Sequence, residues 1–218
     1  MSESLEHWLS LDLSSVCAGL AIHARRGLAL TLLVENNVGI DSNPSEKFLG
    51  ALDEGLGRAG ISLNDISRFI TTSGPGSFTG LRIAYASLKA FAFSTGKPIE
   101  TVNSSEARLA FRGGLAVGAR GAVITTVARD RYTKSEWKMA ERLELVTETV
   151  VSENGLAVSP GTLILRDERT PALPQSELFP LQAKHLGQCL LIASSRKTYA
   201  SLPEWITASP QYFGDRLG

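Results

Sequence analysis

The sequence predicts an α/β fold in which two sub-domains each contain a mixed sheet covered by helices. Short β-branched and apolar runs, which are typical of strands, alternate with longer runs whose apolar residues keep helical spacing. The order of these runs in the first half of the 218 residues is repeated more loosely in the second half. We therefore expect two sub-domains, residues 1–103 and 104–218, with a cleft between them.

Composition restricts the class of protein. The 22 Lys and Arg residues balance the 22 Asp and Glu residues, and 43% of the chain is hydrophobic, as in an ordinary soluble globular protein. A protein that binds nucleic acid by itself usually carries a basic surplus, so a partner would have to supply most phosphate contacts. The polar, acidic segment 1–7 differs from a signal peptide, and no apolar run is long enough to span a bilayer. We expect a cytoplasmic protein that does not contact membranes.

Three strands are expected at the start of the chain, over residues 8–13, 18–23 and 28–35. Because their connections are too short for crossovers, they should form an antiparallel meander. A helix should follow, since Asn43 can cap it and Pro44 suits its first position. This helix should run to about Ala59 and end at Gly60.

The next elements are expected to alternate between strand and helix. Residues 66–72 predict a strand that is parallel to the first, because a helix precedes it. A tight turn, a helix to about Thr95 and a short strand over 98–102 should follow.

The second half predicts further elements of both kinds. A helix is expected over 104–112, and strands are expected over 121–128, 132–140, 143–150 and 161–165. Residues 170–180 should be irregular, and 181–197 should form a last helix. The tail, 203–213, should lie on the surface, anchored by Trp205, Tyr212 and Phe213.

The stretch from Ser73 to Arg82 is the most distinctive part of the sequence. Its glycines permit backbone angles that a Cβ would forbid, so a tight turn is expected before the helix, with Ser77 as its N-cap. Such a turn can direct free N–H groups at an anion, or it can be a rigid corner whose glycines allow close packing. The residues alone favour packing, because short glycine motifs recur often. The motif consists of Gly74, Pro75, Gly76, Ser77, Phe78, Thr79, Gly80 and Arg82.

Three stretches resemble the TsaB (also called YeaZ) family of bacterial proteins. They are the run 74–83 followed by Lys89, the run 102–107 (Val-Asn-Ser-Ser-Glu-Ala) and the opening 11–15 (Leu-Asp-Leu-Ser-Ser). The resemblance covers residues 8 to about 109, and the run 74–83 is far more specific than a lone glycine pair.

The resemblance implies a fold, a role and partners. The family has the actin/Hsp70/sugar-kinase (ribonuclease H-like, ASKHA) fold, with two βββαβα sub-domains about a cleft. Its members, also called glycoprotease-like, are non-catalytic subunits of the machinery that adds a threonylcarbamoyl group to the adenosine next to the tRNA anticodon. They pair with a catalytic homologue, TsaD, and an ATPase, TsaE, joins the pair. We therefore expect no cofactor on this chain and contact with tRNA only through the complex.

The fold family directs attention to a nucleotide site, of which only part is present. Asp12 occupies the acidic position at a strand end, but the turn that follows contains Ser14 and Ser15 and no glycine. A side chain then stands where a phosphate would approach the backbone. In the second half, Asp130 is not followed by the glycine and threonine of the pattern, and no glycine pair follows Gly161. We expect a degenerate nucleotide cleft that does not bind ATP tightly.

Metal chemistry is not expected. The catalytic relatives carry two histidines one helical turn apart, and the corresponding positions here are Ser104 and Arg108, which are poor ligands. His7, His23 and His185 show no helical pairing, and His23 is expected at the surface or as a cap.

The two cysteines, Cys17 and Cys189, are far apart in the sequence and lie in apolar surroundings. Their positions do not match the spacing of a metal site. We expect both to be buried as small hydrophobic residues and not to form a disulfide.

The two predicted helices that end near Ala59 and Thr95 carry more apolar side chains than packing on a sheet requires. Periodicity alone leaves open whether both surfaces are covered within the chain. The resemblance favours a partner interface, because the family pairs through these two helices in a four-helix bundle. The expected interface consists of Phe48, Leu49, Leu52, Leu56, Ile83, Tyr85, Ala86, Lys89, Ala90 and Phe93. Without the partner, the same surface could form a homodimer.

The leading hypothesis is therefore a scaffold subunit that supports a TsaD-like homologue. One alternative is a weak ATPase or kinase of the same fold, with Asp12 as its catalytic acid. The other is a glycoprotease-like peptidase, for which the spacing of residues identifies no nucleophile and base.

Overall fold

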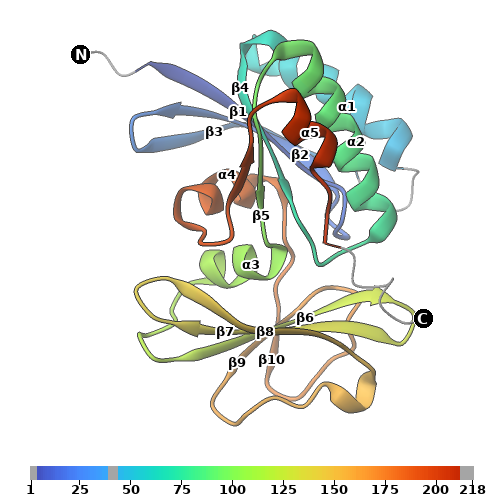
Figure 1. Cartoon of the computed structure of the whole chain (residues 1–218), viewed down its shortest axis with the longest axis vertical. Helices are drawn as coiled ribbons and strands as arrows, with labels where there is room; N and C mark the ends of the chain where they lie inside the picture. The colour runs from blue at the N-terminus through green and yellow to red at the C-terminus, as the bar shows by residue number, and fades with distance from the viewer. Residues whose placement is uncertain (1–3, 39–43, 212–218) are drawn as a thin grey trace.

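The structure is a computed structural model that describes residues 4–38 and 44–211. Its two sheets lie one above the other, with helices between them and on one outer side (Figure 1). The first sheet has six strands in the order β11-β5-β4-β1-β2-β3, and the second has five in the order β10-β9-β6-β7-β8. These two mixed sheets confirm the predicted α/β class.

The first sheet follows the predicted order. Strands β1 (Leu5–Asp12), β2 (Gly19–Arg26) and β3 (Ala29–Asn37) form the antiparallel meander. Strand β4 (Ile66–Thr72) pairs with β1 in parallel, and β5 (Ile99–Val102) pairs with β4 in parallel. A parallel pair needs a crossover connection, which the intervening helices provide.

Helices α1 (Pro44–Ala59) and α2 (Phe78–Thr95) cover one face of the first sheet. Between them, a 3-10 turn, η1 (Leu63–Asp65), precedes β4. Each helix is followed by a glycine with positive φ, 68° at Gly60 and 69° at Gly96, because that backbone region favours glycine.

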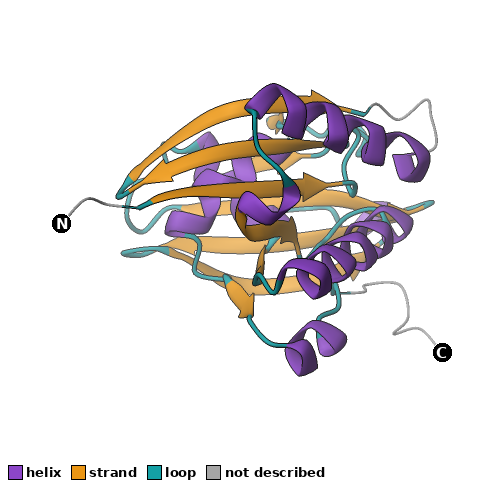
Figure 2. Cartoon of the chain, turned by 90° about the horizontal axis from the view of Figure 1, so that it is seen from above, coloured by secondary structure: helices purple, strands orange, loops and turns teal. Residues whose placement is uncertain are grey.

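Helices α3 (Ser104–Arg112) and α4 (Ala183–Ile192) lie between the two sheets. Helix α4 packs on the inner face of the first sheet, α3 packs against β6 of the second, and the two helices contact each other. The molecule is therefore layered as α1 and α2, first sheet, α4 and α3, second sheet (Figures 1 and 2).

The second sheet begins with a second antiparallel meander. Its strands are β6 (Arg120–Ala128), β7 (Arg131–Met139), β8 (Leu143–Val151), β9 (Leu163–Arg166) and β10 (Ser176–Leu178). Strand β9 pairs with β6 in parallel, and β10 pairs with β9 in parallel. This order repeats that of the first half only in part, as predicted.

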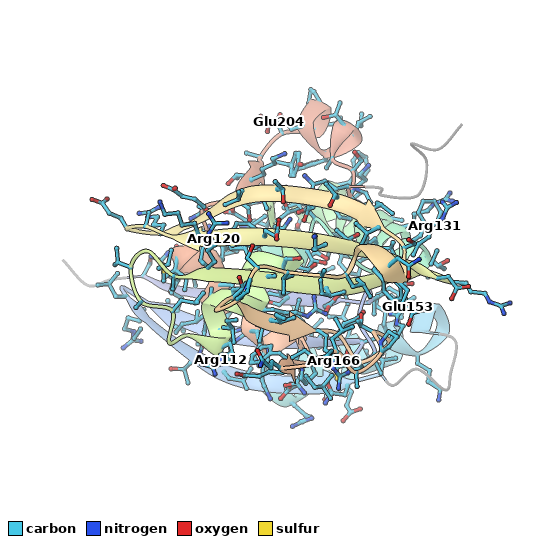
Figure 3. The ribbon with its side chains drawn as sticks, turned by 90° about the horizontal axis from the view of Figure 1, so that it is seen from below. Arg112, Arg120, Arg131, Glu153, Arg166 and Glu204 are labelled. Atoms are coloured by element: carbon cyan, nitrogen blue, oxygen red, sulfur yellow. The ribbon has the colours of Figure 1, made fainter. Side chains whose placement is uncertain are left out.

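Part of the outer face of the second sheet is covered by a loop segment. After the 3-10 turn η2 (Glu153–Gly155), Leu156 and Val158 pack against Ile124. Figure 3 views this face, with Arg120 and Arg131 at opposite ends of the β6–β7 hairpin.

Alternate residues of β1 supply two separate cores. Leu9 and Leu11 belong to the core beneath α1 and α2, whereas Trp8 packs in a core that includes Leu186 of α4. Successive strand residues point to opposite faces, and β1 is a central strand with helices on both sides.

Two predictions about the end of the chain are wrong. The last long helix stops at Ile192, and the segment expected to be irregular contains β10. The chain then returns to the first sheet, where β11 (Lys197–Tyr199) pairs with β5 and α5 (Leu202–Thr207) packs beside α2. A division after Asn103 therefore separates β1–β5 from β6–β10. The segment after α4, although it lies in the second half of the sequence, belongs to the first sheet and its helices.

Trp205 on α5 is buried, as predicted, and its Nε1 donates a hydrogen bond to the carbonyl O of Tyr199 at 2.8 Å. The predicted cap Asn43 and the predicted anchors Tyr212 and Phe213 lie outside the described residues. In the described part of the chain, no helix combines the length and apolarity needed to cross a membrane.

Candidate functional site: the glycine turn and the helix face

The predicted strand, turn and helix are present between β4 and α2. In the turn, Gly74 has a φ of 100°, and its peptide bond to Pro75 is cis. Ser77 is the N-cap of α2, as predicted, and its Oγ accepts a hydrogen bond from the backbone N of Gly80 at 3.3 Å. The motif therefore caps its own helix.

Two glycines of the motif allow a close approach of two backbone segments. A Cβ at Gly80 would lie 1.8 Å from the carbonyl O of Leu13, and a Cβ at Gly76 would lie 2.7 Å from Cβ of Ser14. The backbone N of Ser77 donates to the carbonyl O of Ser14 at 2.9 Å. The geometry thus favours packing over anion binding as the role of these glycines.

Asp12 lies at the carboxyl end of β1 and is fully buried. Its Oδ1 accepts hydrogen bonds from the backbone N of Ser14 at 2.9 Å and from Ser14 Oγ at 2.7 Å. Its Oδ2 is buried and has no partner among the described residues. The carboxylate therefore stabilises its own turn.

The same turn is also bonded to the second half of the chain. Three contacts cross between them: Arg169 Nη2 to Ser14 O at 3.0 Å, Ser15 Oγ to Leu181 O at 3.0 Å, and Cys17 Sγ to Glu168 Oε1 at 3.5 Å. A bound phosphate would need backbone donors at this turn. Here one backbone donor of the turn, the N of Ser14, is engaged by Asp12, and the Ser14 carbonyl and the Ser15 hydroxyl are engaged by the second half of the chain, while Asp12 Oδ2 has no partner among the described residues.

Both cysteines are free, and only one is as buried as predicted. Cys189 is buried, whereas Cys17 is half-buried. Burial raises the pKa of the Cys17 thiol, and the neighbouring Glu168 carboxylate raises it further. Burial raises the pKa of Cys189 to about 12. Both are therefore neutral thiols at pH 7 and poor nucleophiles.

On α3, the two positions that correspond to the histidines of the catalytic relatives hold loops in place. Ser104 Oγ donates to the carbonyl O of Pro75 at 2.5 Å, and the buried Arg108 donates through Nε to the carbonyl O of Phe179 at 3.2 Å. Within residues 4–38 and 44–211, no group of three or more His, Cys, Asp or Glu side chains is arranged to hold a metal ion.

The expectation that His23 lies at the surface is wrong. Its side chain is buried against α4, where a Cβ on Gly187 would lie 2.9 Å from His23 Nδ1. His185 is also buried, stacked on the Phe111 ring at 4.0 Å, and its Nδ1 accepts a hydrogen bond from the backbone N of Gln182. Burial lowers the pKa of each imidazole to about 4, so both are neutral at pH 7.

Half of the residues expected at a partner interface lie in the core of this chain. Phe48, Leu52 and Tyr85 are only 4%, 7% and 3% exposed. Leu56 and Ile83 are half-buried against the same core. The expectation that Phe48, Leu52 and Tyr85 face a partner needs correction, because the first sheet and the neighbouring helices already cover them. Leu56 and Ile83 are only partly covered.

The other half of the expected interface lies at or near the surface. Leu49 on α1 is 53% exposed and Phe93 on α2 is 70% exposed, and Ala86 and Ala90 are also exposed. Lys89 is half-buried, because its Nζ donates to the carbonyl O of Ile206 on α5 at 3.1 Å.

The sequence prediction missed the exposed side of α5. Leu202 and Ile206 are 46% and 67% exposed, while Trp205 on the opposite side of the same helix is buried. The spacing of four residues between Leu202 and Ile206 was the available signal, but the prediction for residues 203–213 was only that they lie on the surface.

Known sequences match parts of this chain. The TsaD family model, tRNA N6-adenosine threonylcarbamoyltransferase, matches residues 41–129. The tRNA threonylcarbamoyladenosine biosynthesis protein TsaB of Bacillus subtilis is 30% identical over 98 residues, which are 45% of this chain and 41% of that protein. The tRNA N6-adenosine threonylcarbamoyltransferase of Rhizobium meliloti is 46% identical over 55 residues, 25% of this chain and 15% of that protein. The chain thus spans less than half the length of these relatives.

Solved structures match nearly the whole chain. YeaZ from Pseudomonas aeruginosa has a TM-score of 0.66 at 21% identity, with 95% of this chain and 99% of that chain covered. An uncharacterized protein with similarity to peptidase YeaZ from Pseudomonas aeruginosa has a TM-score of 0.68 at 22% identity, with the same coverage. The fold is therefore that of YeaZ. Together with the sequence match to TsaB of Bacillus subtilis, this fold confirms the predicted resemblance to TsaB (YeaZ).

Proposed function

We propose that this chain is a non-catalytic subunit in tRNA threonylcarbamoyladenosine synthesis, where it binds and supports a TsaD-like catalytic homologue. The observation that carries the proposal is the turn at Asp12, where Asp12 Oδ1 bonds to its own loop and Ser14 and Ser15 bond to the second half of the chain. A TsaE-like ATPase would join the pair in the cytoplasm, and tRNA would be contacted through the complex.

The outward sides of α1 and α2 have the chemistry of a helical docking surface. Leu49 and Phe93 are large exposed apolar side chains, which are typical of interaction sites. Ala86 and Ala90 are small, so the backbone of a partner helix can approach α2 closely. The core residues of the same helices hold this surface against the first sheet.

The proposal is tested by tRNA modification with and without this chain, with the TsaD-like and TsaE-like proteins held constant. We expect modification to depend on the chain, and a stable pair with the TsaD-like protein at micromolar concentration. Phe93→Glu should abolish pairing and modification. Leu28→Glu is the matched control, because Leu28 is 90% exposed in the turn between β2 and β3, and this turn lies away from α1, α2 and α5 (Figure 1).

Two outcomes would contradict the proposal. One is the absence of a complex with the wild-type chain at micromolar concentration. The other is full modification activity in reactions that lack the chain.

One observation favours weak nucleotide binding as a second candidate. Asp12 Oδ2 is buried without a partner among the described residues, at the strand end where ATP-binding relatives place an acidic group. Calorimetry with ATP and Mg²⁺ separates the candidates: millimolar or no affinity supports the scaffold, and micromolar affinity lost in Asp12→Asn supports an ATPase. A peptidase has less support, because the lowered pKa values of His23 and His185 make both poor general bases at pH 7.

A further inference from the structure

We infer that α5 is the third helix of the docking surface, so that a partner seated on α1 and α2 also contacts Leu202 and Ile206. This inference rests on the proposed function. Helix α2 lies between α1 and α5 (Figures 1 and 2). The residues that would form this three-helix face are Leu49, Ala86, Ala90, Phe93, Leu202 and Ile206.

Helix α5 is fixed in place by its surroundings. It has only six residues, too few to be stable alone in water. Trp205 inserts into the core beneath α2, and Lys89 Nζ on α2 donates to the carbonyl O of Ile206 at 3.1 Å. Beyond the helix, the backbone N of Gln211 donates to the carbonyl O of Ser73 at 2.7 Å. The outward side of α5 is therefore presented in a defined position beside α2.

The outward side of α5 continues the apolar surface of α2. Leu202 and Ile206 are one helical turn apart and are 46% and 67% exposed. Phe93, which is 70% exposed, is one helical turn from Lys89, so it lies on the side of α2 that contacts α5. Large apolar side chains gathered in this way on neighbouring helices are typical of a protein interface.

Charge indicates the kind of partner that fits this face. The basic residues of this face lie on and just after α2, because residues 78–97 contain Arg82, Lys89 and Lys97 but no Asp or Glu, whereas α1 contains Asp and Glu as well as Lys and Arg, and α5 contains Glu204. A complementary occupant is a helical protein surface that carries apolar side chains flanked by carboxylates. In the proposed complex, that surface would belong to the catalytic homologue.

The test measures the Kd for the TsaD-like protein with the full chain and single variants of it. Leu202→Glu and Ile206→Glu remove exposed apolar contacts and add a charge of the same sign as the expected carboxylates. Leu202 is the first residue of α5, where a carboxylate suits the helix N-terminus, so this variant should keep its fold. We expect each variant to weaken binding about tenfold or more, and the control Leu28→Glu to stay within about twofold of wild type.

The outcomes separate this inference from the proposed function. If both α5 variants bind like wild type while Phe93→Glu does not bind, α5 lies outside the interface: the inference is overturned and the proposed function stands. Tighter binding by the α5 variants also overturns the inference, because α5 would then compete with the partner. If the wild-type chain binds only a second copy of itself, or does not bind at all, the proposed function fails and the inference with it.

Discussion

The turn after β1 and the three-helix face differ in whether their side chains are free to contact a ligand or partner. In the turn, Asp12, Ser14 and Ser15 have the chemistry of a ligand site, but their side-chain oxygens, apart from Asp12 Oδ2, bond to the protein. On the helices, Phe93 and Ile206 have the chemistry of core residues, but they are exposed. The contrast shows that the contacts around a side chain, and not its type, decide whether a ligand or partner can use it.

The largest expected effect on stability comes from a comparison of two substitutions, at apolar residues that the sequence analysis assigned to the same interface. Leu52→Glu puts a charge into the core, so we expect it to lower the free energy of unfolding by about 4 kcal/mol or more. Phe93→Glu is a surface change and should alter it by about 0.5 kcal/mol at most. Urea unfolding followed by circular dichroism measures both. Similar losses of stability in the two variants would contradict the assignment of Leu52 to the core and Phe93 to the exposed helix face.

Gly80→Ala tests the close approach of the glycine turn to the turn after β1. The new Cβ would lie 1.8 Å from the carbonyl O of Leu13, so the backbone must move, and we expect a loss of about 3 kcal/mol. Gly57→Ala on α1 is the matched control, because a Cβ there meets nothing within 4 Å, and it should stabilise the helix by up to about 1 kcal/mol. Thermal unfolding of the two variants side by side is the measurement. Wild-type stability of Gly80→Ala would show that the packing is looser than described.

The buried histidines should make stability depend on pH. His23 has a pKa of about 4 in the folded protein, against about 6.5 when unfolded, so the unfolded state binds more protons between these values. The contribution of His23 to stability is therefore fully present above pH 6.5 and is lost as the pH drops toward 4, by up to about 3 kcal/mol. His185, with its pKa also lowered to about 4, should act in the same direction.

The measurement is the free energy of unfolding of wild type and His23→Gln at a series of pH values. We expect a shallower dependence in the variant between pH 6.5 and 4, whatever its stability at pH 7. An unchanged slope would mean that His23 is not buried as a neutral group.

The smallest effect is expected at Arg169, whose guanidinium donates one hydrogen bond to the carbonyl O of Ser14. Because Arg169 is exposed, Arg169→Ala should cost no more than about 1 kcal/mol. The affinity of the Arg169→Ala variant for ATP, measured by calorimetry, should remain as weak as that of wild type. An affinity for ATP in the micromolar range would show that this arginine blocks a working nucleotide site. The turn after β1 would then be available to a ligand, contrary to the comparison above.

Local signals predicted most of the individual elements. The bounds of α2 agree with the prediction, because Ser77 caps its start and Gly96 ends it, and both signals lie next to the helix. The motif 74–82 also led to the TsaB (YeaZ) resemblance, which the fold and the sequence matches confirm. Local signals failed after Ile192, because the predicted helix extends to residue 197 whereas the observed helix ends at Ile192 and the chain then forms β11.

The sequence by itself determined the order of strands and helices, the glycine turn and the relatives it resembles. These features depend on caps, turns and periodicity, which act between residues close together in the chain. Only the tertiary structure decided that β11 completes the first sheet, that α5 lies beside α2, and that Leu52 is covered while Phe93 is exposed. Burial and strand pairing depend on segments that are far apart in the sequence and meet only when the chain folds, so no local pattern predicts them.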